Sequence, residues 1–160
     1  MQISEAPVVE LSEYEKERGK PEPSYHHGLV QGRLTGALAL TKRYSVLSEL
    51  TLELPDGRSI TPDLSVYLPI RHDWNHDIIR MKQMPLLAVE ILTVGLTVQN
   101  ALERIAIYFA HGVKSAWLVQ PNEQTISIDL PNASRPQVFT TGEARDPVTG
   151  LTARLEEIFA

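Results

Sequence analysis

The sequence contains no cysteine. Disulfide bridges, thiolate nucleophiles and cysteine-based zinc or iron–sulfur sites are therefore excluded, and nothing in the chain requires an oxidising compartment. Residues 1–20 lack a long apolar segment, because apolar side chains alternate there with acidic and basic ones. We therefore expect neither a signal peptide nor a membrane anchor in this stretch, no membrane partner, and a cytoplasmic location.

Positive charge is also scarce, with 15 Lys and Arg against 20 Asp and Glu and a net charge of −5. This balance argues against a protein that coats nucleic acid, because non-specific affinity comes mainly from basic side chains that neutralise phosphates. It does not exclude an enzyme with a local nucleic-acid site, since a carboxylate-lined metal site adds negative charge and the bound ion inverts the local field. The length and the 42% hydrophobic fraction predict one globular domain over residues 1–160, with 1–23 as an N-terminal arm.

Apolar side chains at helical spacing, together with capping residues, predict three helices. They are expected at 11–18, at 24–43 with Ser24 as N-cap, and at 97–111 with Gly112 just beyond the end. The last of these helices is expected to turn one stripe towards the core, formed by Val98, Ala101, Leu102, Ile105 and Phe109.

Alternating or continuous apolar runs predict the strands of a mixed sheet, at 45–54, 59–68, 86–92, 115–119, 125–130 and 137–141. The first two should form an antiparallel hairpin around the turn at 55–58. Residues 69–84 are expected to be a loop with a helical turn around 76–81. The crossover from 86–92 through a helix to 115–119 requires a parallel pair, so the class is α/β, bordering on α+β.

Acidic residues on neighbouring strands are the most informative feature of the chain. Asp63 opens one apolar run and Glu90 lies inside another, where an unpaired carboxylate would be costly. Hard divalent cations such as Mg²⁺ select carboxylate oxygens, and a metal held against a phosphodiester polarises it and activates water. Glu49 is a candidate third ligand across the hairpin, and Arg104 on the following helix is a candidate cation for the charge that builds during hydrolysis.

Each of these acids also has a structural interpretation. An aspartate after proline often caps its own backbone, as Asp63 could, and a buried glutamate such as Glu90 can simply pair with an arginine. Tyr108 and Trp117 are interpreted as core residues rather than as platforms for base stacking.

The histidines are weaker candidates. His72 and His76 stand four residues apart, which is a zinc-binding spacing on a helix, but their segment is expected to be a loop. His26 and His27 could reach the acidic site or a DNA phosphate, yet a solvated helix start is the preferred interpretation.

Six segments together resemble the Uma-two family, which comprises restriction-endonuclease-like proteins of the PD-(D/E)xK superfamily. These segments are 14–21, 24–27, 48–50, 61–63, 85–92 and 108–121. The resemblance extends from about residue 11 to residue 159. It implies a restriction-endonuclease-like core, a requirement for Mg²⁺ with Mn²⁺ as a substitute, and a DNA substrate, with Asp63 and Glu90 in the acidic motif and as metal ligands.

Two positions depart from the family pattern. The lysine of the superfamily pattern would fall at Leu92. Members of the family resemble one another in placing a lysine on the next helix instead, at the position of Arg104 in this chain. Arginine keeps the charge but is larger and cannot give up a proton, so the exchange is not neutral. The family's Ser-Pro after Glu-Ile-Leu is also replaced, here by Thr93-Val94-Gly95.

The sequence therefore predicts a Mg²⁺-dependent DNA endonuclease, weakened by Arg104 at the usual lysine position. The alternatives are a catalytically inactive homologue that binds nucleic acid or protein as a dimeric module, and a dimeric scaffold without nucleic acid. A homodimer is expected, with residues 21–25 and the edge of the 125–141 meander as candidate contact surfaces. Arg104 neutralising Glu90 directly would favour an inactive site.

Overall fold

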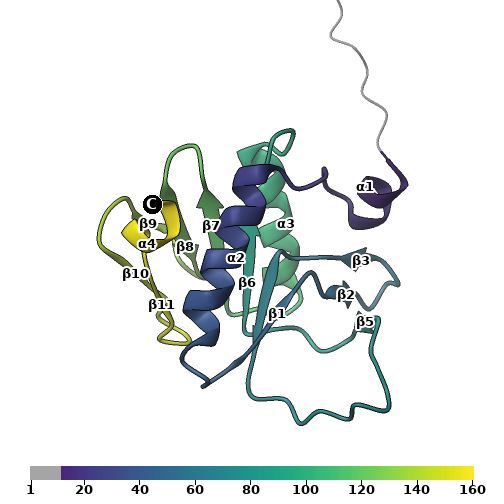
Figure 1. Ribbon diagram of the computed structural model, residues 1–160. Coiled ribbons are helices and arrows are strands. Elements are labelled where there is room, and N and C mark those ends of the chain that lie inside the picture. Colours follow the sequence, from purple (N-terminus) through teal and green to yellow (C-terminus); the bar gives the residue numbers. More distant parts are fainter. Residues whose placement is uncertain (1–11) are drawn as a thin grey trace, which may run out of the picture.

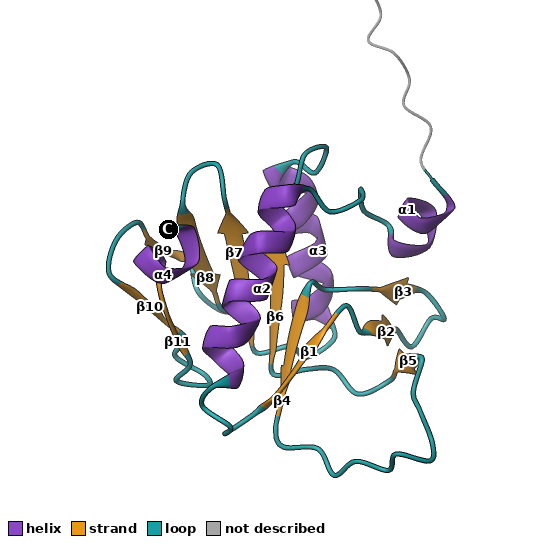
Figure 2. Cartoon of the chain, viewed as in Figure 1, coloured by secondary structure: helices purple, strands orange, loops and turns teal. Residues whose placement is uncertain are grey.

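The computed structural model describes residues 12–160, and it confirms a mixed α/β architecture (Figures 1 and 2). The four helices of this part are α1 (Glu13–Arg18), α2 (Tyr25–Ala39), α3 (Val98–Ala110) and α4 (Leu155–Phe159). The strands of the main sheet are β1 (Ser45–Ser48), β4 (Leu64–Tyr67), β6 (Leu87–Ile91), β7 (Ser115–Gln120), β8 (Thr125–Asp129) and β9 (Gln137–Phe139). Residue 11 of the first expected helix and the first eleven residues of the expected arm lie outside the described residues.

The main sheet has the order β1-β4-β6-β7-β8-β9. β6 and β7 are parallel, as the crossover through α3 requires, and the other neighbouring pairs are antiparallel. All five residues of β6 are buried, which explains its continuous apolar sequence. The expected central strand and its parallel partner are therefore confirmed.

Helices cover both faces of this sheet, with α2 in front of it and α3 behind it in the view of Figure 1. Alternate residues of β6 pack into different apolar clusters, because side chains alternate across a strand. Val89 lies in the cluster with Leu34 of α2, whereas Ala88 lies in the cluster with Ile105 of α3. Glu90 therefore points towards α3.

Capping residues fix where the helices begin. The side chains of Ser12, Ser24 and Thr97 each accept a hydrogen bond from a backbone N–H in the first helical turn. The N-cap expected at Ser24 is confirmed, and Gly112 has the positive φ of 95° expected just past α3.

The segments 45–54 and 59–68 pair in the antiparallel direction, as expected, but neither forms one continuous strand. The first segment divides into β1 and β2 (Thr51–Glu53), and the second into β3 (Ser59–Ile60) and β4. The break falls at Glu49, whose φ of 57° is left-handed and uncommon for a residue with a Cβ atom. A separate small sheet of order β3-β2-β5 results, in which β5 (Arg80–Met81) replaces the helical turn expected around 76–81.

The core stripe expected on α3 is correct for Ala101 and Ile105, which are buried, and for Phe109, which packs against the core, but wrong for Val98 and Leu102. Val98 and Leu102 are 41% and 43% exposed, whereas the buried residues of the helix are Ala101, Arg104, Ile105 and Tyr108. The inward face is thus rotated, because it must place two polar side chains beside Glu90. A second small sheet, β10 (Glu143–Arg145) with β11 (Thr152–Arg154), lies between β9 and α4 in the chain. Across residues 12–160, no helix is long and apolar enough to cross a membrane.

Candidate functional site

Asp63 directly precedes β4 and lies beside the part of β6 that holds Glu90. Leu64, the next residue, is the register partner of Val89. The Asp63 N–H also donates to the Val89 carbonyl, over 3.0 Å, which is one residue out of step with that register, so the ladder is irregular where β4 begins. Both acidic residues are fully buried. The two principal sequence candidates are therefore brought together.

Three groups surround the carboxylate of Asp63. Lys20 Nζ donates to Oδ1 over 2.6 Å, His27 Nε2 lies 3.0 Å from the same oxygen, and the Ile91 N–H donates to Oδ2 over 2.6 Å. Burial opposes ionisation, but the hydrogen bond from His27 and the charge of Lys20 outweigh it and lower the pKa of Asp63 from 3.8 to about 2. Asp63 is therefore a stable carboxylate.

Glu90 is held by two side chains from α3. Arg104 Nε donates to Glu90 Oε1 over 3.0 Å, and the Tyr108 hydroxyl donates to the same oxygen. Arg104 also anchors the neighbouring chain, because its Nη2 donates to the Thr61 carbonyl over 2.7 Å. The other carboxylate oxygen, Glu90 Oε2, is buried and has no hydrogen-bond partner in the described part of the chain.

Burial dominates the ionisation of this second group. It raises the pKa of Glu90 above 4.5 despite the nearby charge of Arg104. Burial also disfavours the charged guanidinium, but the carboxylate of Glu90 outweighs that effect and raises the pKa of Arg104. The two acids thus differ, and Glu90 is the more readily protonated member of the pair.

Glu49 lies on the other side of Asp63 from Glu90. Its N–H donates to the Asp63 carbonyl over 3.1 Å, and its carboxylate accepts a hydrogen bond of 3.1 Å from Gln31 Nε2 and forms an ion pair with Arg18. Within residues 12–160, no three acidic or histidine side chains are arranged to hold a metal ion together. Glu49 therefore flanks the acidic pair but does not form a three-carboxylate metal centre with it.

Each acid of this region has its own cation. Lys20 pairs with Asp63, Arg104 with Glu90, and Arg18 with Glu49. The sheet and its break supply the acids, whereas α3 supplies one cation and the segment around α1 supplies two. A patch with three negative charges is thus neutralised by the protein itself.

Sequence reasoning missed Lys20 and misplaced His27, which was interpreted as solvated but is only 2% exposed. Spacing could have found His27, because it lies on the same stripe of α2 as Val30, Leu34 and Leu38. Tyr108 is buried as expected, yet its hydroxyl serves Glu90. Lys20 carried no periodic signal, because it lies in a connector, and only its place in the segment 14–21 pointed to it.

The donor set suits a hard divalent cation in part. Asp63, just before β4, and Glu90, in β6, are carboxylates, which is the ligand type that Mg²⁺ prefers, and Glu90 Oε2 is a buried acceptor without a partner. Asp63 Oδ1 accepts a hydrogen bond from Lys20 and lies 3.0 Å from His27 Nε2, and Oδ2 accepts one from the Ile91 N–H. These two acids therefore fit a metal if the ammonium group moves away and the metal shares the Asp63 carboxylate with His27 and the Ile91 N–H.

Comparisons with known proteins give the family and the fold of the chain. A model of the Uma2 family, described as "Putative restriction endonuclease", matches residues 7–156. The crystal structure of a "putative nuclease belonging to DUF820" from Anabaena variabilis is similar, with a TM-score of 0.72 and 23% identity, covering 87% of this chain and 83% of that chain. This likeness shows the fold.

A cryo-EM structure of a DrdV–DNA complex is a more distant match, with a TM-score of 0.36 and 14% identity over 69% of this chain and 84% of that chain. No curated protein matches the chain. The family resemblance inferred from the six sequence segments is confirmed.

Proposed function

We propose that this chain, which belongs to the Uma2 family of restriction-endonuclease-like proteins, is a nuclease that hydrolyses DNA phosphodiesters at Asp63 and Glu90 with a divalent cation. The observation that carries the proposal is the placement of these two buried carboxylates close together, one just before β4 and the other in β6, with the cations Lys20 and Arg104 around them. Metal-dependent hydrolysis of a phosphodiester uses acids and cations together, because the metal must be held beside groups that stabilise the developing negative charge.

The energetic cost of the arrangement supports a functional role. Removing an ion from water costs several kcal/mol, and apolar replacements of a buried pair are often as stable. The same fold shows a cheaper way to bury an acid, since Asp146 is satisfied by the neutral donors Ser115, Trp117 and Thr149. Stability alone therefore does not account for the charged groups around Asp63 and Glu90.

Mg²⁺, or Mn²⁺ in its place, would be held by Asp63 and by Glu90 through its unpartnered Oε2. When bound, the metal would supply polarisation of the phosphoryl oxygen and an activated water. Tyr108 and Arg104 fix the orientation of Glu90 by bonding its Oε1, which leaves Oε2 free. His27 and the Ile91 N–H hold Asp63 differently, because they contact Oδ1 and Oδ2 respectively.

Lys20 and Arg104 are the groups that can neutralise a bound phosphate. Lys20 supplies an ammonium group beside Asp63 although the position two residues after Glu90 is Leu92. The lysine of the superfamily pattern thus has a candidate counterpart from a different part of the chain. Arg104 keeps a positive charge beside Glu90 but is engaged with Thr61 and Glu90, which limits its movement.

A second function is a catalytically inactive module that binds nucleic acid or protein. The direct contact between Arg104 Nε and Glu90 Oε1 favours it, because a guanidinium that already neutralises the carboxylate weakens its attraction for a metal. The nuclease would cleave DNA and the inactive module would not, but both would use the same charged site.

Plasmid nicking separates them. Wild type, Arg104→Lys and Asp63→Ala are compared with Mg²⁺ and with Mn²⁺, and each protein is also tested for a shift of DNA in a gel. We expect slow nicking by wild type, faster nicking by Arg104→Lys because a compact ammonium can approach the attacking water, and none by Asp63→Ala. If none of the three nicks while wild type shifts DNA, an inactive module that binds nucleic acid is supported, and if neither effect occurs, the nuclease proposal fails and a scaffold without nucleic acid takes its place.

A further inference from the structure

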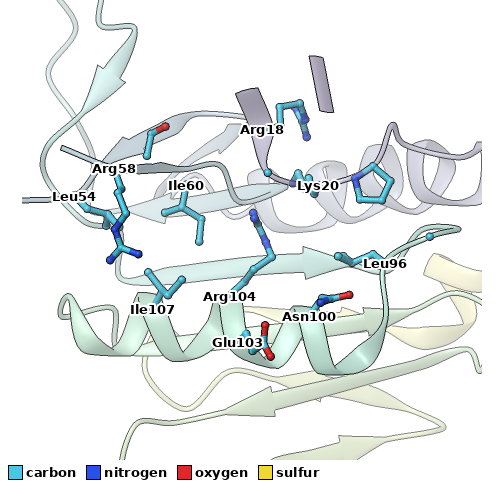
Figure 3. A pocket seen from close by; sticks show the side chains of 14 residues that line it. Arg18, Lys20, Leu54, Arg58, Ile60, Leu96, Asn100, Glu103, Arg104 and Ile107 are labelled. Carbon is cyan, nitrogen blue, oxygen red and sulfur yellow. The ribbon is translucent and has the colours of Figure 1, made fainter. Parts of the chain in front are cut away.

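A pocket of about 420 Å³ opens over Arg104, between the end of α1, the β2–β3 hairpin and α3 (Figure 3). Figure 3 shows Arg104 rising from α3 into this space, with Lys20 on one side and Arg58 on the other. Its charged lining residues are Arg18, Lys20, Arg58, Arg104 and Glu103.

The pocket has a pronounced charge asymmetry. Arg18, Lys20 and Arg104 line it, but their partners Glu49, Asp63 and Glu90 do not. Each ion pair thus turns its cation towards the pocket and its carboxylate away from it. Whatever enters meets positive charge first, so the pocket suits an anion.

The other lining residues define what kind of anion fits. Ser59 and Asn100 provide neutral polar groups, and apolar side chains provide the remaining walls. These apolar residues are Pro21, Leu54, Ile60, Leu96 and Ile107. The volume lies within the range of about 300–1,000 Å³ typical of small-ligand sites, which is more than a bare phosphate needs. A phosphate that carries a sugar uses both the cations and the apolar walls.

We infer that this pocket binds a phosphate group with an attached deoxyribose, supplied either by a nucleotide unit of DNA or by a free nucleotide, without any metal. The inference rests on the proposed function for its choice of sugar-phosphate, and it identifies where the backbone of the substrate contacts the protein. Arg58 is the lining cation that pairs with none of Asp63, Glu90 and Glu49, since its partner is the exposed Asp56.

The test measures binding rather than activity. Calorimetric titrations in the presence of EDTA compare thymidine 5′-monophosphate, inorganic phosphate and thymidine on the full chain. We expect the nucleotide to bind more tightly than phosphate, and thymidine not to bind detectably, because the cations contribute the larger share of the affinity.

Three single substitutions at exposed positions locate the ligand without touching the buried ion pairs. Arg58→Gln should weaken nucleotide binding about threefold to tenfold, and Glu103→Gln, which removes the only acid among the described lining residues, should strengthen it by a similar factor. Arg135→Gln, an exposed arginine in the β8–β9 turn outside the pocket, is the matched control and should leave the affinity unchanged.

Equal effects of Arg58→Gln and Arg135→Gln, binding of thymidine as tight as that of the nucleotide, or no binding of either phosphate compound would overturn the inference. Because EDTA removes metal ions, failure of the nuclease proposal gives a different result: plasmid nicking is absent while the nucleotide still binds and responds to Arg58→Gln. If wild type nicks plasmid but Arg58→Gln does not weaken nucleotide binding, the nuclease proposal is supported and the pocket is not the phosphate site.

Discussion

Replacing Asp63 by Asn removes one charge from the site while keeping the size of the side chain. In the folded protein the ionised Asp63 is stabilised by His27 and Lys20, and its pKa falls from 3.8 to about 2 although the residue is fully buried. The variant should therefore be less stable than wild type at neutral pH, even though it loses no apolar contact.

The size of the effect follows from the pKa. The change from 3.8 to about 2 corresponds to about 2.4 kcal/mol in favour of folding when Asp63 is ionised. The substitution also leaves the ammonium group of Lys20 buried without its carboxylate, and breaking a buried pair typically costs about 3–5 kcal/mol. We therefore expect Asp63→Asn to lower the free energy of unfolding by at least about 2.4 kcal/mol at pH 7.

The pH dependence distinguishes this explanation from a packing defect. Because the folded pKa is lower than the unfolded one, the stabilisation is complete above 3.8 and disappears as the pH falls through about 2. At pH 3 about half of it, about 1.3 kcal/mol, should remain. Urea unfolding in EDTA at pH 7 and pH 3 measures this, with Asp77→Asn on the exposed 69–84 loop as the control. A cost that is equal at both pH values, or a variant as stable as wild type, would refute the reasoning.

Three further predictions concern the rest of the site and the assembly. Glu90→Gln should show the opposite pH trend to Asp63→Asn: burial raises the pKa of Glu90 above 4.5, so its contribution is present below 4.5 and lost as the pH rises through the folded value. Urea unfolding of Glu90→Gln at pH 4 and pH 7 should therefore give a larger cost at pH 4, and a larger cost at pH 7 would contradict it. Lys20→Met should tighten Mn²⁺ binding without DNA about tenfold in electron paramagnetic resonance titrations, because it removes one of the two donors at Asp63 Oδ1 and a repelling charge, and unchanged or weaker binding would show that Lys20 does not compete with the metal. Sedimentation at micromolar concentration should show a homodimer, with 21–25 and the 125–141 meander as candidate contacts, and a clean monomer would exclude it.

Much of the fold follows from local patterns in the sequence. The continuous apolar run of β6 indicates a buried central strand, and a helix between it and β7 requires the parallel pair. Ser24 and Gly112 mark helix ends because a serine side chain satisfies a free N–H and glycine adopts positive φ without strain. What the sequence does not show is the break at Glu49, since its left-handed conformation depends on its contacts with Asp63, Gln31 and Arg18.

The candidate site, like the fold, is predictable from the sequence only in part. Asp63 and Glu90 are predictable because each interrupts an apolar run, and the pairing of β4 with β6 brings them close together. The face of α3 was predicted wrongly in part, because Val98 and Leu102 are more apolar than Arg104 and Tyr108, and hydrophobicity alone favours the first two as core residues. Burying the polar stripe is favourable only when Glu90 is present to pair with it, which is a tertiary contact that periodicity does not contain.

The position of Lys20 shows why the segment around α1 is part of the site rather than an appendage. Three carboxylates lie side by side at the end of the sheet, and α3 offers only Arg104 to neutralise them. The negative charge of Asp63 contributes to the raised pKa of Glu90, and a protonated acid binds metal poorly. Arg18 and Lys20 supply the two missing charges and line the pocket that a phosphate would enter. Lys20 can therefore keep Asp63 ionised before substrate arrives, and both cations can contact the phosphate when it does.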